Sequence, residues 1–566
     1  MDRTALVLIA LVSVAASACS SASPAGPQNR SAGAQPTAAP EVAKSLVVAI
    51  PSEPEGFGEM FAGGNSGPEH LQAMLHRDLV QPDERGTYIP EVAADLPSQE
   101  KGTWTILPDG RMNTIWELKP NVLWHDGGPL RADDVFFSWQ VAIAPDVPYK
   151  QRDAAKLIEG IQILDTETFV IHWKSFYVGA DRLTTRDLFL LPRHILESTF
   201  VDDRTAFVNS SFWTTDFVGV GPYRLVSWIP GSSAQLQAFD RFFGNQPHIQ
   251  NVTVRFIPDS NTELASILGG NTDVQLGRSL GLEHALLLSN QWESTGAGRV
   301  ITYPRGIFEI RFAAGDPRVA DLRVRQALYH AMDRQGIVDN LYRGKLEVAN
   351  SFANPRATEF ADVDPQITKY PYDPARAATL LAETGWRKAG DGILRNDRDE
   401  PYTLPFSTTA SNQERDQLQS TVADMWRTAG FDVQIENVPL SVQNSASYDF
   451  ATTDLSGVNA DFEPNLPRID GRNLKTPQNP RGANVWGYAN LEVDDLIDQW
   501  QHTTDKASSV QLEGQILHRV SEDLPILPIN YRIEVITVRK GVTGVPQRSE
   551  ATGNNSAWNI EDWDIT

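Results

Sequence analysis

Alternating apolar and polar positions predict a β–α–β unit in the middle of the chain. Asn251-Val-Thr-Val-Arg-Phe256 alternates as a strand does. Ser260 and Glu263 follow at the S-x-x-E spacing of a capping box, and apolar residues at helical spacing then predict a helix that Gly269-Gly270 ends. Thr272-Asp-Val-Gln-Leu276 returns as a strand. This succession implies parallel pairing of the two strands.

A second unit of the same kind is predicted further along the chain. A strand over Tyr402 to Phe406 leads into a helix near Gln413 to Ala429. Gly430 ends that helix, and Phe431-Asp-Val-Gln-Ile435 is the next strand. Two such units predict an α/β protein.

Further helices and strands complete the predicted architecture. Asp373-Pro374 supplies an N-cap and a first-turn proline, and Gly385 the end of that helix. Apolar residues at helical spacing predict one long helix from Asp321 to about Gly344. Short alternating runs predict antiparallel strands at Thr114–Leu118, Phe169–Trp173 and Tyr223–Phe239. Without an internal repeat, this pattern predicts several α/β or α+β modules rather than one barrel.

The N-terminus has the pattern of an export signal. Ala5 to Ala16 is apolar except for Ser13, about the length of a signal h-region and too short to span a bilayer. Small residues then precede Cys19, the one cysteine of the chain. Residues 1–18 are therefore predicted to be a signal peptide, and residues 19–43, rich in Ser, Ala, Pro and Gly, a flexible tether. This pattern resembles the bacterial lipobox, which implies lipid modification of Cys19.

Composition excludes several classes of protein. The 566 residues allow three or four hydrophobic cores, and a single Cys excludes a disulfide framework. With 49 Lys and Arg against 72 Asp and Glu, the formal net charge is −23. This charge repels phosphate backbones, so nucleic acid is not expected as a partner.

Motifs that would indicate catalysis or cofactor binding are weak. The sequence has no G-x-S-x-G, H-E-x-x-H or phosphate-binding-loop pattern and no pair of Cys for zinc. Gly219-Val-Gly221-Pro222 lacks the third glycine of a dinucleotide fingerprint, because Arg224 stands there, so we interpret it as a turn into a strand. His70 and His76 are six residues apart and do not share a helical face. We therefore predict no catalytic residue, no metal and no cofactor.

Five blocks, in order along the chain, resemble one family. The first is Trp116-Glu-Leu-Lys-Pro-Asn-Val-Leu-Trp124-His-Asp126-Gly127-Gly-Pro129, which runs into Ala132-Asp133-Asp134-Val135. The others are Gly219–Gly231, Ile257–Asp273, Asp321–Arg334 and Glu522–Pro528. Together they resemble the family 5 extracellular solute-binding proteins of ABC importers, over most of residues 46 to 532.

The resemblance implies an α/β, two-lobed periplasmic-binding-protein-like fold of type II, cluster C, with an extra domain inserted in the first lobe. By analogy the first lobe comprises residues 44–85, 210–303 and 528–566. The inserted domain comprises 86–209 and the second lobe 304–527. A ligand closes such lobes only to the extent that it binds the closed form better than the open form.

The resemblance also suggests ligand-binding residues. In peptide-binding relatives an aspartate of the second lobe pairs with the ammonium of the ligand, and by position Asp461 matches it. Ser456, Gly457 and Asn459 are neighbours with backbone or amide groups to offer, whereas Leu455 and Phe462 replace residues that relatives commonly have as Trp and Pro. Phe308 is a candidate pocket aromatic, with core packing as the alternative. Asp461 as an ordinary loop carboxylate is likewise the alternative to a binding role.

The predicted function is that of a non-enzymatic, substrate-binding lipoprotein of an ABC importer. The expected partners are a di- or oligopeptide, the permease subunits and, through the lipid anchor, the outer face of the membrane or the periplasmic space. We expect a monomer. One alternative keeps the role and changes the solute to an oligosaccharide, a nickel chelate or another small molecule. The other is a secreted hydrolase on a two-lobed scaffold.

Overall fold

A ten-stranded mixed sheet runs through the centre of the computed structural model, which describes residues 43–58, 67–149, 152–312, 315–410, 412–443, 452–479, 482–547 and 555–566. Its strand order is β16-β15-β17-β12-β18-β11-β1-β10-β9-β8. The strands are β1 Ser45–Ile50, β8 Tyr223–Ile229, β9 Ser233–Ala238, β10 Asn251–Phe256, β11 Val274–Gln275, β12 Gly298–Arg311, β15 Thr403–Thr408, β16 Asp432–Ile435, β17 Thr453–Asn459 and β18 Ile526–Arg539. We call β11, β1, β10, β9 and β8 the β1 half of this sheet and β16, β15 and β17 the β17 half.

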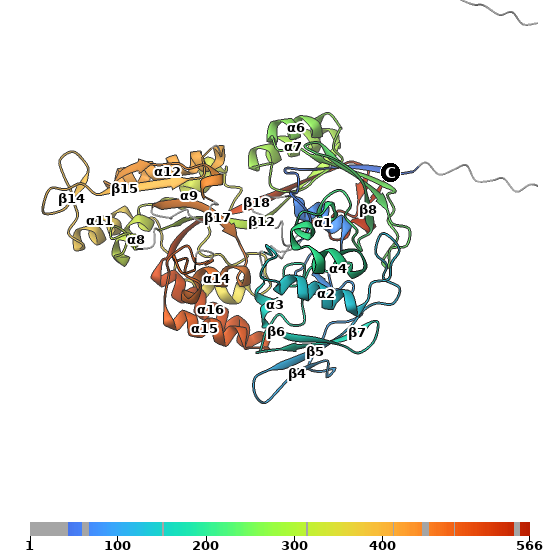
Figure 1. Cartoon of the computed structure of the whole chain (residues 1–566). Helices are drawn as coiled ribbons and strands as arrows, with labels where there is room; N and C mark the ends of the chain where they lie inside the picture. The colour runs from blue at the N-terminus through green and yellow to red at the C-terminus, as the bar shows by residue number, and fades with distance from the viewer. Residues whose placement is uncertain are drawn as a thin grey trace, which may run out of the picture. The chain divides into compact units, whose positions relative to one another are not determined.

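Two long strands join the halves (Figure 1). β12 and β18 each have 14 residues and pair antiparallel from Gly298↔Arg539 to Arg311↔Ile526. The register shifts between Pro304 and Gly306 and again between Phe308 and Glu309. The sheet therefore continues from one half to the other, with two irregularities near the middle of the connection.

The predicted β–α–β unit at 251–276 is confirmed in the β1 half. β10 and β11 both pair parallel with β1, which lies between them. The helix between them, α6 Ser260–Leu268, ends at Gly269 as predicted, but its N-cap is Asp259 and not Ser260. The predicted capping box is wrong because the Asp259 carboxylate accepts from Thr262 N at 2.7 Å, whereas the buried Glu263 carboxylate hydrogen-bonds to Ser279.

The unit at 402–435 is also confirmed. β15 and β16 pair parallel and are connected by α12 Gln413–Ala429. The Asn412 side chain accepts from Arg415 N at the start of α12, and Gly430 ends the helix with φ 112°, a left-handed conformation that glycine adopts without strain. β17 adds to the other edge of β15, also parallel.

One predicted helix is two helices in the structure. α8 Leu322–His330 and α9 Arg334–Leu341 replace the single helix expected over 321–344. The break occurs because the Asp333 side chain accepts from Gly336 N at 2.8 Å and caps a new helix. Apolar residues of both helices pack into the same core. Their helical spacing therefore continues across the break, and the sequence pattern does not reveal it. The helix predicted after Asp373 is confirmed as α11 Pro374–Glu383.

A separate antiparallel sheet lies below the β1 half in Figure 1, with the order β4-β5-β7-β6. Its strands are β4 Trp104–Ile106, β5 Met112–Glu117, β6 Ile158–Ile163 and β7 Thr168–Trp173. This confirms the strands predicted at 114–118 and 169–173, and the antiparallel pair β8–β9 confirms those in 223–239. α2 Ala132–Ile143 packs on β6 and carries Asp133 and Asp134 in its first turn, where carboxylates favour the helix dipole.

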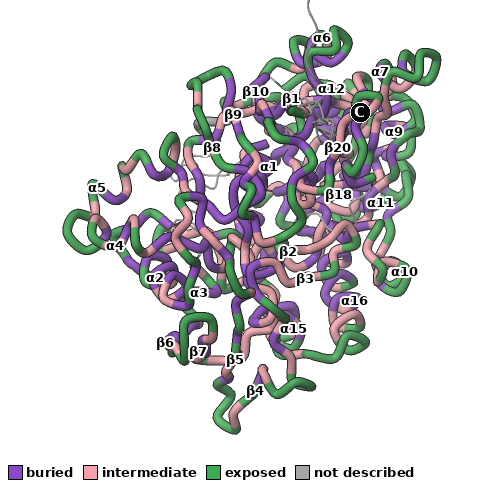
Figure 2. The backbone as a smooth tube through the Cα atoms, turned by 90° about the vertical axis from the view of Figure 1, so that its right-hand side faces the viewer, coloured by how far each residue is buried: buried purple, intermediate pink, exposed green. Residues whose placement is uncertain are grey.

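Other helices and short strands cover these sheets. They are α1 Pro68–Leu75, α3 Asp153–Leu157, α4 Arg193–Asp202, α5 Arg204–Val208, α7 Leu282–Thr295, α10 Phe360–Val363, α13 Leu440–Gln443, α14 Leu466–Ile469, α15 Leu491–Gln501, α16 Lys506–Asp523, β2 Val80–Pro82, β3 Tyr88–Pro90, β13 Arg387–Lys388, β14 Leu394–Arg395, β19 Val542–Thr543 and β20 Asp564–Ile565. Figure 2 shows buried backbone concentrated along the central strands, with exposed residues on outer loops.

Separate hydrophobic cores lie in the two halves. One comprises β1, β10 and the residues around α2 and α4, and another comprises β15, α8, α9, α11 and α12. A further core lies under α15 and α16. The predicted signal peptide, Cys19 and the tether as far as residue 42 lie outside the described residues. Within the described ranges, no helix combines the length and apolar character needed to cross a membrane.

Candidate functional site

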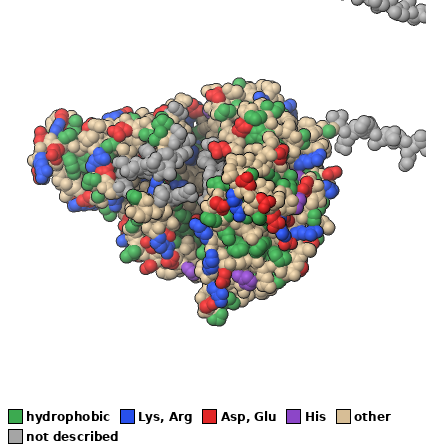
Figure 3. Space-filling model, viewed as in Figure 1, with side chains coloured by type: hydrophobic (Ala, Val, Ile, Leu, Met, Phe, Trp, Pro, Cys, Tyr) green, Lys and Arg blue, Asp and Glu red, His purple; other side chains and the backbone are tan. Residues whose placement is uncertain are grey.

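The surface is hollowed between the two halves of the sheet (Figure 3). Parallel strands of both halves end near this junction, and ligands of open α/β sheets bind beyond the carboxyl ends of parallel strands. One groove of about 770 Å³ spans the junction, lined by Glu283 of α7 from one side and by α9 and α12 from the other. The candidate site is therefore assigned to the segments that meet here.

Phe308, Gly457 and Arg532 are brought together on three adjacent strands. Phe308 of β12 lies opposite Gly457 of β17. The Arg532 guanidinium of β18 lies over the Phe308 ring, 4.7 Å from its centroid, and is half-buried. A Cβ at Gly457 would collide with Arg532 Nη1, so the glycine leaves room for the guanidinium. Phe308 is buried in the core of the β17 half and holds a charged group on its outer side.

The other predicted residues of β17 have different surroundings. Ser456 is almost completely buried opposite Glu309 of β12. Asn459 lies opposite Gly306, and its backbone oxygen accepts from Asn465 Nδ2 at 2.8 Å. Ser456 is thus directed into the protein, whereas Asn459 is the last residue of β17, before the loop that carries Asp461.

Asp461 is half-buried where the β17 half meets residues of the chain before β8. Burial raises the pKa of Tyr88 most, and the charge of Glu463 raises it further. The Asp461 carboxylate adds a smaller contribution in the same direction. Arg182 lies 5.5 Å over the Tyr88 ring and 3.8 Å from Glu463. Burial alone would lower the pKa of Arg182, but Glu463 and Tyr88 raise it. Asp461 therefore lies in an acidic patch that contacts another part of the molecule.

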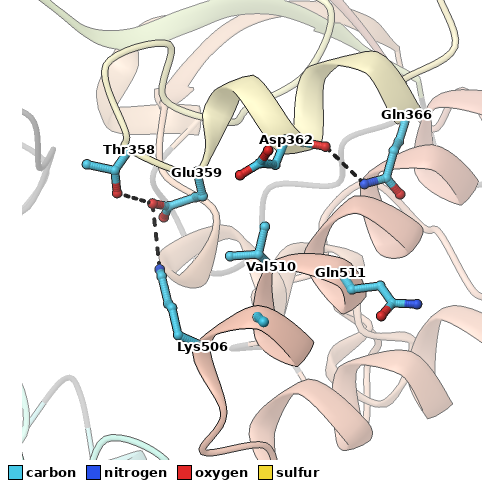
Figure 4. A pocket seen from close by; sticks show the side chains of 8 residues that line it. Thr358, Glu359, Asp362, Gln366, Lys506, Val510 and Gln511 are labelled. Carbon is cyan, nitrogen blue, oxygen red and sulfur yellow. Dashed lines mark hydrogen bonds and ion pairs between the residues drawn. The ribbon is translucent and has the colours of Figure 1, made fainter.

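A second groove, of about 610 Å³, opens on the surface of the β17 half between α10 and the start of α16 (Figure 4). Lys506 lies 3.6 Å from Glu359 on its wall, and Gln366 donates to the backbone oxygen of Asp362. The buried Glu513 follows the groove on α16, and its pKa is raised to about 8 by burial, then by Glu359, with a contribution from Asp461. The polar groups of this groove pair with one another, so we do not assign the site to it.

A buried charged network lies where β12 and β18 connect the halves. Glu534 is fully buried, with Arg305 Nε at 3.0 Å and His70 Nε2 at 3.8 Å. Burial would raise the pKa of Glu534, but Arg305 and then His70 lower it to about 2. Burial would likewise lower the pKa of His70, but the nearby carboxylates of Glu534 and Glu69 raise it. Glu534 is therefore ionised at neutral pH.

A polar chain continues between the carboxyl end of β15 and the start of β17. Arg311 pairs with the buried Asp454 at 2.7 Å. Asp454 also accepts from Gln443, whose amide oxygen accepts from Thr409, and Thr409 in turn accepts from Arg415 Nη1 at 2.6 Å. Arg415 lies in the first turn of α12, where a cation is unfavourable for the helix dipole.

Sequence reasoning missed these arginines. Arg415 follows the carboxyl end of β15, in a strongly acidic chain. A basic residue directly after a parallel strand or in the first turn of a helix was the signal available in the sequence. Arg532 lies in the middle of β18, a strand that was not predicted. Its position next to a strand end or helix start could therefore not mark it.

The glycine motif at 219–222 is structural. Gly221 N donates to Leu75 O at 3.0 Å, and the two glycines enclose His125, which accepts from Gly219 N and donates to Gly221 O. Burial lowers the pKa of His125 to about 4, so its ring is neutral. The interpretation as a turn into a strand is confirmed by β8, which begins at Tyr223. Among the residues that the structure describes, no three His, Cys, Asp or Glu side chains are placed to hold a metal ion.

Comparison with known proteins agrees with this arrangement. The sequence model of the bacterial extracellular solute-binding proteins, family 5, matches residues 92–473. The oligopeptide-binding protein AppA of Bacillus subtilis is 25% identical over 575 residues, covering 99% of this chain and 98% of that protein.

Solved structures show the same fold. An oligopeptide-binding protein from Thermus thermophilus, complexed with a pentapeptide, superposes with a TM-score of 0.76 at 24% identity, covering 92% of this chain and 96% of the other. NikZ from Campylobacter jejuni, in complex with Ni(L-His), gives a TM-score of 0.75 at 22% identity and covers 92% and 99%. The two-lobed α/β fold expected from the sequence is thereby confirmed.

Proposed function

Because this chain belongs to the family 5 bacterial extracellular solute-binding proteins, which deliver solutes to ABC importers, we propose that its solute is a short peptide. The name of the Bacillus relative, which aligns over nearly the whole length of both chains, supports a peptide. The family consists of binding proteins and not enzymes.

The observation that carries the proposal is an open strand edge in the hollow. β15 pairs with β17 only as far as Thr408↔Leu455, whereas β12 pairs with β17 as far as Asn459. Ala460 N donates to Arg305 O on the β12 side. Within the described residues, no strand covers the other edge of β17 beyond Leu455. An extended peptide pairs with such an edge through its main chain, largely independently of its sequence.

We propose that the protein divides into lobes at the boundaries expected from its sequence. The first lobe is 44–85, 210–303 and 528–566, the inserted domain 86–209 and the second lobe 304–527. Closure brings the Asp461 loop of the second lobe against Tyr88 and Arg182 of the inserted domain. We also propose that the chain is exported and anchored through a lipid on Cys19, with the body acting as a monomer outside the membrane.

A thermal-shift screen tests the choice of solute. Tri- to pentapeptides are expected to raise the Tm in a concentration-dependent manner, because a ligand that binds only the folded state stabilises it. Oligosaccharides and nickel–histidine complexes serve as alternative ligands. A Tm increase with either of these, and none with peptides, would replace the peptide with that solute. Recovery of cleaved peptide after incubation would instead support the hydrolase alternative.

The substitution Asp461→Asn is expected to weaken binding of a free-amine peptide by about 10- to 100-fold, since a charge-assisted hydrogen bond contributes about 1.5–3 kcal/mol. Binding of the N-acetylated peptide is expected to change little. Isothermal titration calorimetry with both peptides measures this difference. The exposed Asp397→Asn is a matched control that should bind both peptides as the wild type does. Equal losses for the two peptides would exclude Asp461 from binding the ammonium.

A further inference from the structure

Arg532 reaches across three strands toward the open edge of β17. It lies on β18 opposite Gly306 of β12, and its guanidinium covers the ring of Phe308, 4.7 Å from the ring centroid. A Cβ atom on Gly457 of β17 would collide with Arg532 Nη1. The guanidinium therefore occupies the space that a side chain at Gly457 would fill, on the strand that carries the open edge.

The guanidinium of Arg532 has no anionic partner in the described part of the chain. No carboxylate of these residues lies within 4 Å of it, and no hydrogen bond joins it to another of their groups. The charge of Glu414 acts on Arg532, but the Glu414 carboxylate lies beyond this distance. Arg532 is half-buried, and its contact is the face of an aromatic ring, which leaves its N–H donors unused. A half-buried cation of this kind favours an anion beside it.

Gly457 is also the point at which an extended ligand would pair with β17. Ala460 N donates to Arg305 O, so the backbone groups of Ala460 point to β12. Along a strand these groups point to the two edges in turn, and those of Asn459 and Gly457 therefore point to the open edge. The backbone oxygen of Asn459 accepts from Asn465 Nδ2, whereas no strand of the described residues pairs with Gly457 at this edge. A peptide strand is therefore expected to form its hydrogen bonds with Gly457.

Side chains of a paired strand alternate between the two faces of a sheet, so the peptide residue opposite Gly457 is the one that faces Arg532. Its Cα atom would lie about 5.5 Å from that of Gly457. Its side chain would lie on the face that carries Phe308, the residue of β12 opposite Gly457. The peptide residues before and after it would point to the other face, on which Ser456 and Glu309 lie opposite each other.

We propose that this protein prefers peptides that carry aspartate or glutamate at the residue paired with Gly457, and that Arg532 binds this side-chain carboxylate. The inference rests on the peptide function proposed above and adds a preference at one position of the peptide. The Phe308 ring holds the planar guanidinium in one orientation before the ligand binds, and such a guanidinium is suited to a carboxylate.

Titration calorimetry with pentaalanine peptides that carry Glu or Gln at each position in turn tests the proposal. Because all these peptides have the same terminal groups, the ratio of the two dissociation constants at a position reports the side chain and not the terminal carboxylate. The wild type is expected to bind the Glu peptide about tenfold more tightly than the Gln peptide at one position, and not at the positions adjacent to it.

In Arg532→Gln the ratio at this position is expected to fall to about threefold or less. A dissociation constant is measured on the folded fraction alone, so partial unfolding of the variant does not change the ratio. The exposed Arg398→Gln is the matched control and should keep the wild-type ratio.

Equal affinity of the wild type for the Glu and Gln peptides at every position would overturn the acidic preference and leave the peptide function intact. A preference of similar size at adjacent positions would show a general attraction for negative charge and overturn the assignment to one paired residue. An unchanged ratio in Arg532→Gln would overturn the role of Arg532. If no pentapeptide binds, the peptide function itself fails, and this inference fails with it.

Discussion

Replacing Glu534 with glutamine is expected to lower the free energy of unfolding by about 3–5 kcal/mol at pH 7, because it removes the nearest carboxylate, at 3.0 Å, from the largely buried Arg305, whose other carboxylate neighbour, Glu69, is 3.9 Å away. The Glu534 side chain is fully buried, and the ring of His70 lies 3.8 Å from its carboxylate. Denaturant unfolding of the wild type and of Glu534→Gln measures the difference. Glu100→Gln, at an exposed carboxylate, is the control and should unfold as the wild type does.

The difference in unfolding free energy between the wild type and Glu534→Gln is expected to depend on pH. The pKa of Glu534 is lowered from 4.5 to about 2, so the stabilisation from its ionised form is complete above pH 4.5 and is lost as the pH falls through 2. The advantage of the wild type over Glu534→Gln from this source should therefore shrink from about 3 kcal/mol at pH 7 to about 1.5 kcal/mol at pH 3. A difference that stays constant over this range would contradict the ionised network.

A double variant separates the lost pairing from lost packing. Adding Arg305→Gln to Glu534→Gln removes the cation that Glu534 neutralised and should recover part of the lost stability. Purely additive destabilisation would show that the two side chains contribute independently.

Gly221→Ala is expected to destabilise the protein by about 3 kcal/mol or more, because its Cβ would overlap the backbone of Leu75 and His76. Backbone at this point is fixed by the hydrogen bond from Gly221 N to Leu75 O and by His125 on the other side. It therefore has little freedom to move away.

Thermal unfolding measures the Gly221→Ala effect. Gly390→Ala is the matched control, since a Cβ at Gly390 meets no atom within 4 Å and the residue is exposed. The Tm of Gly390→Ala should equal that of the wild type. A similar Tm for Gly221→Ala would mean that the segments before and after the glycine pack less closely than the structure describes.

Local elements were predictable because their signals are local. The helix over Gln413–Ala429 has its cap residue before it and its terminating glycine after it, so its limits were visible in the sequence. Asp333 also caps a helix, but it lies inside a continuous apolar pattern, and the periodicity outweighed the cap. The capping box at Ser260 failed because Asp259, one residue earlier, competes for the same donors.

Features that depend on distant segments were not predictable from one sequence. The insertion of β1 between β10 and β11 follows from pairing across some 200 residues, and no local pattern encodes it. The predicted Phe308 and Gly457 do lie together, but what joins them is Arg532, which sequence reasoning missed.

The two register irregularities of the β12–β18 connection have a mechanical consequence. An antiparallel ribbon bends and twists most readily at its bulges, and these flank Gly306 and Phe308. Arg532 lies opposite Gly306 and covers Phe308. The most flexible point of the connection is therefore the segment from Gly306 to Phe308, which lies within the candidate site itself and not at a distance from it.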